Sequence, residues 1–279
     1  MGILGIVQRF REHLERLGYS RSTVLMLPNC LQEFLIFTSK STREITPKDI
    51  ENYYQYLQTR PNKRRPGGLS ESMINHHIFS LKLFFSYQME IGFLSQNPIS
   101  GLSFKRPESK PREFLTLVEI KQVYEVTKTV KERAILALFY GCGLRRNEGE
   151  KMDLKDVSFK KQILYVRSGK GGRRRAVPMS HRVRKDLFNY LQNGRGSSME
   201  PALILNRNGQ RMRGDSFNRA LKELMERTDI QKVITLHSLR HSIATHLLES
   251  GLSIEKVRDF LGHKHLESTQ IYTRIHEDF

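Results

Sequence analysis

The sequence has 279 residues, enough for one large domain or two smaller ones with hydrophobic cores of their own. Lys and Arg number 47 against 29 Asp and Glu, which gives a formal net charge of +18. Such an excess favours a polyanionic partner, because cations that bind phosphates release condensed counterions. No segment approaches the length of about 18 apolar residues that a membrane span needs, and the two cysteines, Cys30 and Cys142, predict no disulfide framework. These features favour a cytosolic protein that acts on nucleic acid.

The first hundred residues have the apolar spacing of helices, with capping and turn-forming residues between the apolar runs. Helices are predicted over residues 7–17, 22–37, 46–57 and 70–92. Thr46 is the expected N-cap of the third helix, and Pro28 is expected to kink the second. No strand pattern appears in this region, so it predicts an all-helical domain.

Two segments rich in proline and glycine interrupt this pattern. Residues 59–70 form a basic loop, and residues 95–114 carry three prolines with mixed charge, which is typical of an interdomain linker. We therefore predict an N-terminal helical domain over residues 1–104, a linker over 105–113 and a second domain over 114–279.

The second domain begins with a capping box, in which Thr116 precedes Glu119 and an apolar run. Residues 130–143 are apolar on most of a helical circumference and predict a central helix. Between residues 157 and 179 the apolar period changes towards two, which indicates a small antiparallel sheet with a glycine-rich turn. The rest of the chain returns to the helical period, so the fold class expected is mainly α with a small antiparallel sheet.

The helix expected over residues 235–251 places His237, Arg240 and His241 on one face. A solvated polar face would have the same pattern. A zinc pair at His237 and His241 is a further alternative, but Arg240 adds a fixed cation beside them and the HExxH glutamate is absent. The sequence therefore argues against a metal site.

Two more segments bear cations where chemistry can use them. Arg145 directly follows the predicted central helix and a glycine-rich break, and Glu148 lies within reach of its guanidinium. A surface salt bridge, worth less than about 1 kcal/mol, is the alternative for this pair. Lys170 lies between glycines at the predicted hairpin tip, where the phosphate-loop pattern is absent and simple solvation is the alternative.

The motifs "GLRRNE", "GKG", "HSLRH", "LGH" and "TQIYT" occur in the order and approximate spacing of the tyrosine recombinases. The sequence thus resembles Xer-type recombinases and phage or transposon integrases over nearly its whole length, because residues 70–102 also resemble that family's N-terminal core-binding domain. The resemblance implies a two-domain clamp on double-stranded DNA and strand exchange without metal, nucleotide or other cofactor. Its product would be DNA integration, excision, inversion or dimer resolution.

The resemblance also implies a catalytic set: Arg145, Lys170, His237, Arg240, His263 and Tyr272. Tyr272 would be the nucleophile that forms a 3′-phosphotyrosyl link, helped by cations and a base because a tyrosine holds its proton at pH 7.

The other members of this set would serve the same phosphate. Arg145 and Arg240 would stabilise the charge that develops on it. His237 would be the general base or a phosphate ligand, and Lys170 would protonate the leaving 5′ oxygen as general acid. His263 would hydrogen-bond the phosphate, while Glu148 would orient Arg145.

The expected DNA contacts are basic residues of the N-terminal loop and the hairpin: Lys63, Arg64, Arg65, Arg173, Arg174 and Arg175. Most would bind phosphates, which position a protein without reading sequence. Two details differ from many relatives: Asn147 and Gly149 flank Glu148, and only seven residues follow Tyr272. With so short a tail, we expect a monomer in solution that forms a tetramer on paired DNA sites. The need for accessory proteins is left open, and the expected location is the cytoplasm, at a bacterial or archaeal nucleoid.

Three alternatives remain at this point. An enzyme like the type IB topoisomerases would relax supercoiled DNA that lacks a specific site. A non-catalytic DNA-binding accessory protein would bind DNA without forming a covalent adduct. A metal-dependent hydrolase built on the histidines would lose activity with EDTA.

Overall fold

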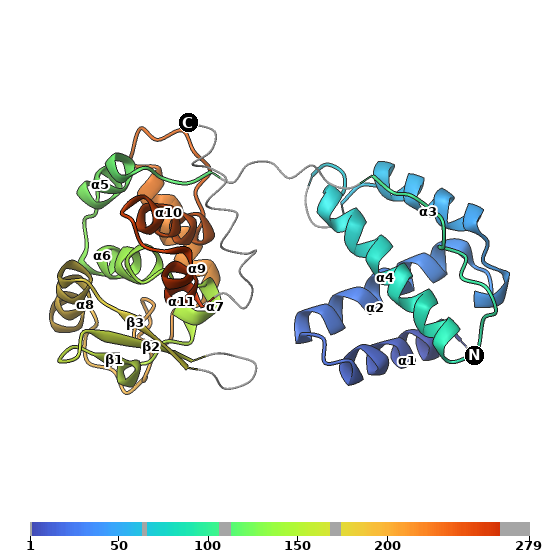
Figure 1. Ribbon diagram of the computed structural model, residues 1–279, viewed down its shortest axis with the longest axis horizontal. Coiled ribbons are helices and arrows are strands. Elements are labelled where there is room, and N and C mark those ends of the chain that lie inside the picture. The colour runs from blue at the N-terminus through green and yellow to red at the C-terminus, as the bar shows by residue number, and fades with distance from the viewer. Residues whose placement is uncertain (1, 63–65, 106–112, 168–173, 263–279) are drawn as a thin grey trace. The chain divides into compact units, whose positions relative to one another are not determined.

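The computed structural model describes residues 2–62, 66–105, 113–167 and 174–262. The chain divides into two compact units, Met1–Lys110 and Pro111–Phe279 (Figure 1). Each unit has a hydrophobic core of its own. Among the described residues, no helix combines the length and the apolar character that a membrane crossing requires.

The described part of the first unit contains only helices as regular elements. They are α1 (Ile3–Arg16), α2 (Arg21–Thr38), the short 3₁₀ helix η1 (Thr42–Glu44), α3 (Pro47–Thr59) and α4 (Glu71–Glu90). Side-chain oxygens of Ser20, Thr46 and Ser70 accept hydrogen bonds from the first turns of α2, α3 and α4, which explains where these helices begin. Helix α2 runs through Pro28 without ending there.

Aromatic side chains fill the core of the first unit. Phe10 meets Phe84 edge to face, with ring centroids 5.6 Å apart. The hydroxyl of buried Tyr53 lies 2.9 Å from Nδ1 of His77, which is itself buried. The helical packing therefore encloses His77 in the core of this unit.

The second unit combines helices with a small sheet. Its helices are α5 (Leu117–Glu125), α6 (Val130–Leu136), the π-helical turn η2 (Ala137–Gly141), α7 (Arg146–Glu150), the 3₁₀ helix η3 (Leu154–Asp156), α8 (His181–Asn193), α9 (Gly214–Met225), α10 (Leu236–Glu249) and α11 (Ile254–Leu261). The sheet contains β1 (Val157–Ser158), β2 (Ile163–Arg167) and β3 (Arg174–Pro178) in that order, all antiparallel. The predicted fold class, mainly α with a small antiparallel sheet, is confirmed.

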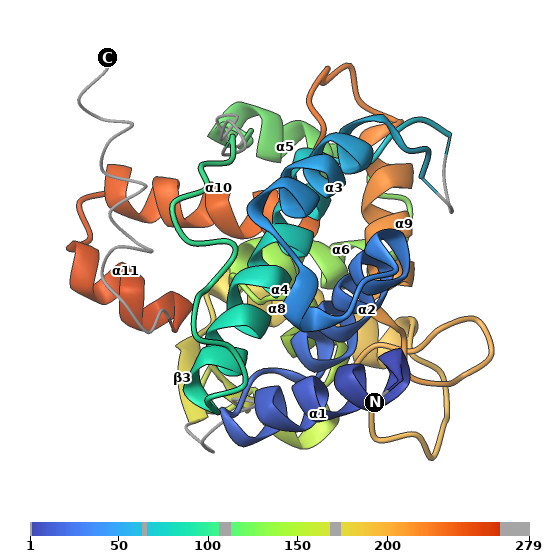
Figure 2. The same cartoon turned by 90° about the vertical axis from the view of Figure 1, so that its right-hand side faces the viewer.

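Strand register explains which side chains of the sheet enter the core. Leu164 on β2 pairs with Val177 on β3, and both are buried. Because side chains alternate along a strand, Arg175 projects from the same face of β3 as Val177. Helix α11 contacts β3 and α10, as Figures 1 and 2 show. An arginine of the sheet thus points towards α11.

The segment that enters the site departs from a regular α-helix. The predicted central helix is α-helical over α6 and then widens into η2, where the amide of Cys142 donates to the carbonyl of Ala137. Gly143 follows with φ +59°, and a Cβ there would come within 2.9 Å of Leu261. Only glycine suits both the backbone and the space, so this turn brings the chain close to α11 and directs it to Arg145.

Candidate active site

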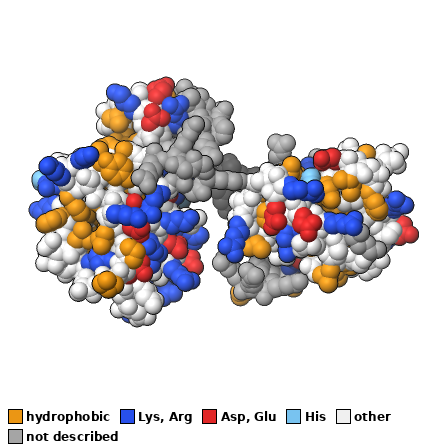
Figure 3. Space-filling view, turned by 90° about the horizontal axis from the view of Figure 1, so that it is seen from below, with side chains coloured by type: hydrophobic (Ala, Val, Ile, Leu, Met, Phe, Trp, Pro, Cys, Tyr) orange, Lys and Arg blue, Asp and Glu red, His pale blue; other side chains and the backbone are white. Residues whose placement is uncertain are grey.

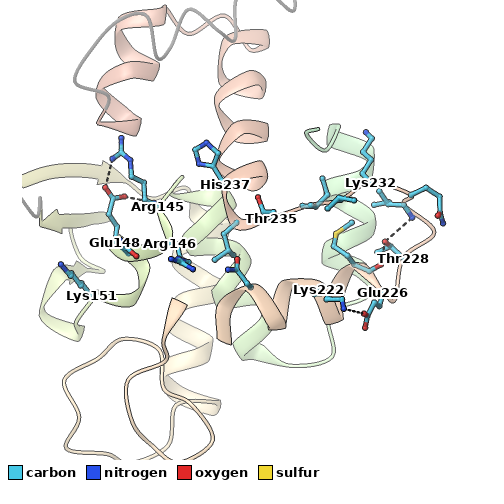
Figure 4. Close-up of a pocket in the computed structure, with 18 of the residues that line it drawn as sticks. Arg145, Arg146, Glu148, Lys151, Lys222, Glu226, Thr228, Lys232, Thr235 and His237 are labelled. Atoms are coloured by element: carbon cyan, nitrogen blue, oxygen red, sulfur yellow. Dashed lines mark hydrogen bonds and ion pairs between the residues drawn. The ribbon is translucent and has the colours of Figure 1, made fainter. Parts of the chain in front are cut away.

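A cleft of about 1250 Å³ opens in the second unit beside α7, α9 and the segment leading into α10 (Figure 4). Among the residues that the structure describes, its lining contains six cations: Arg145, Arg146, Lys151, Arg167, Lys222 and Lys232. From the same described part of the chain, the glutamates Glu148 and Glu226 also line it. The balance of charge suits an anionic substrate.

Arg145 is placed at the cleft by its own local structure. It is the residue before α7, and its backbone amide donates to Oε2 of Glu148 over 2.8 Å, which caps that helix. Its Nη1 also donates to Oε1 of Glu148, at 2.8 Å. The Arg145 side chain is 42% exposed, so its guanidinium is held on one side and open to the cleft on the other.

Glu148 is the acceptor that the arginines of this site share. Besides Arg145, it receives a two-pronged contact from Arg175, with Nη1 to Oε1 at 2.8 Å and Nη2 to Oε2 at 2.9 Å. Nη1 of Arg240 lies 3.9 Å from Oε2. Burial by itself would raise the pKa of the Glu148 carboxyl, but the hydrogen bonds and charge of Arg175, with those of Arg145, lower that pKa from 4.5 to about 2. The carboxylate therefore stays ionised and holds several guanidiniums in place.

Arg240 lies on α10 and is almost fully buried, with 1% of its surface exposed. Its Nη1 donates to the carbonyl of Gly143, and its Nη2 donates to the carbonyl of Leu261 over 2.6 Å. A buried cation needs such acceptors, because transfer out of water is costly without them. Arg240 thus joins three parts of the unit: α10, the turn before α7 and the end of α11.

The C-terminal end of α11 receives three guanidiniums on three consecutive carbonyls. Arg175 donates to Phe260 over 3.2 Å, Arg240 to Leu261, and Arg145 to Gly262 over 3.0 Å. Carbonyls at a helix C-terminus lack partners within the helix and carry partial negative charge, which favours cations there. The three contacts fix this helix end against the arginine cluster.

His237 lies on the first turn of α10 and lines the same cleft as Arg145 (Figure 4). Thr235 caps that turn by accepting from the amide of Ser238. His237 is exposed, whereas His241, one turn later, is buried beside the ring of Phe114. Among the described residues, no group of three or more His, Cys, Asp or Glu is arranged to hold a metal ion.

The remaining predicted residues fall mainly outside the described ranges. These are Lys63, Arg64, Arg65, Lys170, Arg173, His263 and Tyr272. Arg174 is the first residue of β3, and its backbone is described while its side chain is not. Figure 3 shows Lys and Arg side chains spread over the visible face of each unit, interspersed with Asp and Glu.

Sequence reasoning assigned Arg175 to DNA contact and missed its internal partners. The strand pattern could have predicted that Arg175 points inward, because it shares a face with the buried residues Val177 and Met179. The close approach at Gly262 was also missed. Its φ is +67°, and a Cβ there would come within 2.8 Å of Arg175 Cδ.

Paired arginines, an ionised glutamate that orients them, and a histidine in a basic cleft form the site expected of an enzyme that acts on a nucleic-acid phosphate. Comparisons with known proteins give this class a family. The Phage integrase family pattern matches residues 113–278, and the N-terminal SAM-like domain pattern of phage integrases matches residues 6–91. The chain therefore belongs to the phage integrase family of tyrosine recombinases, site-specific enzymes that cleave and rejoin DNA.

Relatives from archaea and bacteria match nearly the whole chain. It is 32% identical to the tyrosine recombinase XerA of Pyrococcus furiosus over 277 residues, which cover 97% of this chain and 89% of that protein. It is 30% identical to the tyrosine recombinase XerC of Chromobacterium violaceum over 281 residues, or 96% of this chain and 89% of that protein.

Solved structures show the same fold. A crystal structure of XerA recombinase matches with a TM-score of 0.56 and 30% identity, covering 98% of this chain and 94% of that one. The Tn1549 transposon integrase, solved in complex with circular intermediate DNA, matches with a TM-score of 0.77 and 20% identity. That match covers 96% of this chain and 94% of the integrase.

Proposed function

We propose that Tyr272 is the nucleophile that cleaves each DNA strand. Its phenolic oxygen attacks the scissile phosphorus, forms a 3′-phosphotyrosyl bond and displaces the 5′ oxygen of the next nucleotide. In the rejoining step a 5′ hydroxyl attacks the phosphotyrosine and releases Tyr272. Because one phosphoester replaces another, the energy of the broken linkage is conserved and religation needs no nucleotide cofactor.

Arg145 and Arg240 stabilise the negative charge that builds up on the phosphate oxygens during attack. Arg145 uses two N–H groups for Glu148 and Gly262, out of the five that a guanidinium carries, and its side chain is 42% exposed in the cleft. Arg240 is fixed by the carbonyls of Gly143 and Leu261, and its buried positive charge adds to that of Arg145. Charges held in place before the reaction act without reorganisation, which is the main source of such stabilisation.

Three residues complete the proposed chemistry. His237, on the cleft wall, takes the proton of the attacking tyrosine or binds the phosphate as it forms. Lys170 protonates the leaving 5′ oxygen, and His263 hydrogen-bonds the phosphate. Glu148 acts through Arg145, because it binds both the amide and the guanidinium of that residue.

The single observation that carries this proposal is the Arg145–Glu148 pair at the mouth of a basic cleft. Both contacts between them have good hydrogen-bond distances, 2.8 Å each, and the carboxylate is 13% exposed. A surface salt bridge would leave both partners solvated and mobile. Here the glutamate is anchored inward while the arginine presents itself to solvent.

The proposed partner is double-stranded DNA, and the proposed active assembly is a tetramer on two paired sites. Exchange between two duplexes requires cleavage of four strands, so four tyrosines must act. Lys63, Arg64, Arg65, Arg173 and Arg174 are proposed to contact DNA phosphates. Whether exchange gives integration, excision, inversion or dimer resolution depends on how the two sites are arranged, and accessory proteins can impose that arrangement. The proposed location is the cytoplasm of a bacterial or archaeal cell, at chromosomal DNA or at a mobile element.

Covalent trapping tests the proposal. DNA fragments bound by the protein are selected from a genomic library and then nicked beside the cleavage position, so that the short product diffuses away and religation is prevented. Wild-type protein should form a denaturant-resistant adduct, Tyr272→Phe should form none, and the control Tyr165→Phe should form it as wild type does. An adduct that persists in Tyr272→Phe, or tight binding to a selected site without any adduct in wild type, would overturn it.

A further inference from the structure

Arg175 has the contacts of a structural arginine, although it lies in the basic run of the hairpin. Its side chain is 15% exposed. Three of its nitrogens donate to described acceptors: Nη1 and Nη2 to Glu148, and Nε to the carbonyl of Phe260. A guanidinium engaged in this way has few donors left for a phosphate of DNA.

The contact with Glu148 sets the direction of that carboxylate. Arg175 binds both carboxylate oxygens at once, and such a fork fixes the carboxylate plane as well as its position. The same two oxygens hold Arg145, Oε1 by its guanidinium and Oε2 by its backbone amide. Any rotation of Glu148 would therefore be passed on to Arg145.

The contact with Phe260 links Arg175 to the end of α11. Arg145 holds the carbonyl of Gly262 in the same last turn, so both guanidiniums bind one carboxylate and one helix end. Gly262 lies against the Arg175 side chain, with space for no Cβ between them. From Gly262 the chain continues to the motif residues His263 and Tyr272.

We infer that Arg175 is a positioning residue for strand cleavage, which fixes the Glu148 carboxylate and the last turn of α11 so that Arg145 faces the cleft. The inference rests on the proposed role of Arg145 in binding the scissile phosphate. It differs from a DNA contact at Arg175, which would act on affinity. A positioning residue acts on the rate of the chemical step once DNA is bound.

The test compares cleavage rate with DNA affinity in Arg175→Met and Arg175→Lys. Single-turnover cleavage is measured on the nicked trapping substrate at saturating protein, and the Kd is measured at several salt concentrations. We expect cleavage by Arg175→Met to be about 100-fold slower, the size of effect that a small misplacement of a binding group can cause. Its Kd and the salt dependence of that Kd should match those of wild type. Arg175→Lys keeps the charge without the fork and should be slowed as well.

The opposite pattern would overturn the inference. A cleavage rate like that of wild type at saturation, combined with weaker binding and a salt slope smaller by about one, would make Arg175 a phosphate contact. Arg184→Met is the matched control. Arg184 lies on α8, away from Glu148 and the arginines that bind it, and its Nε also donates to a backbone carbonyl of this unit, that of Phe159. It should cleave at the wild-type rate.

A double-mutant cycle separates positioning from general structural damage. If Arg175 acts through Glu148, Arg175→Met should slow cleavage by much less in a Glu148→Gln background than in wild type. Additive effects of the two substitutions would count against the inference. Failure of the proposed function is distinguishable, because wild type itself would then form no adduct.

Discussion

Replacing Glu148 with glutamine should destabilise the second unit, and the loss should depend on pH. Glutamine keeps the size of the side chain but removes the charge on which Arg145 and Arg175 converge. Glutamine also replaces one acceptor oxygen with an amide NH₂ group, a donor that cannot accept a hydrogen bond from a guanidinium. The perturbation therefore isolates the electrostatic part of the cluster.

The magnitude follows from the lowered pKa of the Glu148 carboxyl. Burial opposes ionisation, but the Arg175 and Arg145 contacts outweigh it and lower the pKa from 4.5 to about 2. This pKa difference means that ionisation of Glu148 stabilises the folded state relative to the unfolded state by about 3 kcal/mol. Because the folded pKa lies below the unfolded one, this stability is fully present above about pH 4.5 and is lost as the pH falls towards 2. Glu148→Gln should therefore cost about 3 kcal/mol at pH 7 and about half of that or less at pH 3.

The chain provides its own reporters for the assay. Each unit has one buried free cysteine, Cys30 in the first and Cys142 in the second. Brief exposure to a disulfide reagent that reacts at acid pH, in increasing urea, labels each thiol as its unit unfolds. Mass spectrometry separates the two labels, so that Cys30 serves as an internal reference for Cys142.

Two outcomes would refute the reasoning. One is a urea midpoint for the labelling of Cys142 that is the same in wild type and Glu148→Gln at pH 7. The other is a shift of that midpoint by Glu148→Gln that has the same size at pH 7 and at pH 3. The control Glu226→Gln removes an exposed charge paired with Lys222 at 3.6 Å on the same helix surface. It should change stability by less than about 0.5 kcal/mol.

Three further predictions concern backbone space, core packing and metal dependence. Gly262→Ala should slow cleavage and lower the Tm, because it adds a Cβ at φ +67° within 2.8 Å of Arg175. The control Gly251→Ala also has a positive φ, +88°, but its Cβ would meet open space, so it should show only the backbone cost of about 1 kcal/mol. Gly149→Ala should destabilise the second unit by about 1–3 kcal/mol, because its Cβ would lie 2.5 Å from the Phe139 ring. In a urea titration, the double variant that also carries Phe139→Leu should recover part of that lost stability. EDTA should leave the rate of adduct formation unchanged, and a loss of cleavage that added metal restores would contradict the proposed chemistry.

The sequence predicted the fold class because its patterns are local. Helix caps such as Thr46 and Thr116, and the change of apolar period after residue 157, depend only on neighbours along the chain. The pairing of Arg145 with Glu148 was within reach for the same reason, since the two lie in one helical turn. The order and approximate spacing of the remaining motifs supplied the family resemblance.

Contacts between distant segments lay beyond such reasoning. The fork from Arg175 to Glu148 and the three carbonyls at the end of α11 depend on how β3, α7 and α11 meet. Gly149 shows the same limit. The sequence marked it as different from many relatives, and only the packing of Phe139 over it gives the reason.

The π-helical turn η2 has a consequence for which changes of chain length this enzyme tolerates. A π turn holds one residue more than an α turn, and here it ends just before the turn that leads to Arg145. The extra residue is absorbed within that turn, so removing one residue from Ala137–Gly141 would restore the α-helical period and leave Arg145 and Glu148 in place relative to Arg175 and the end of α11. A second deletion would have no extra residue to remove. It would rotate all that follows by about 100° around the helix axis and turn Arg145 and Glu148 together away from Arg175. The first residue lost from this apolar stretch would thus keep the two halves of the site together, and the second would separate them.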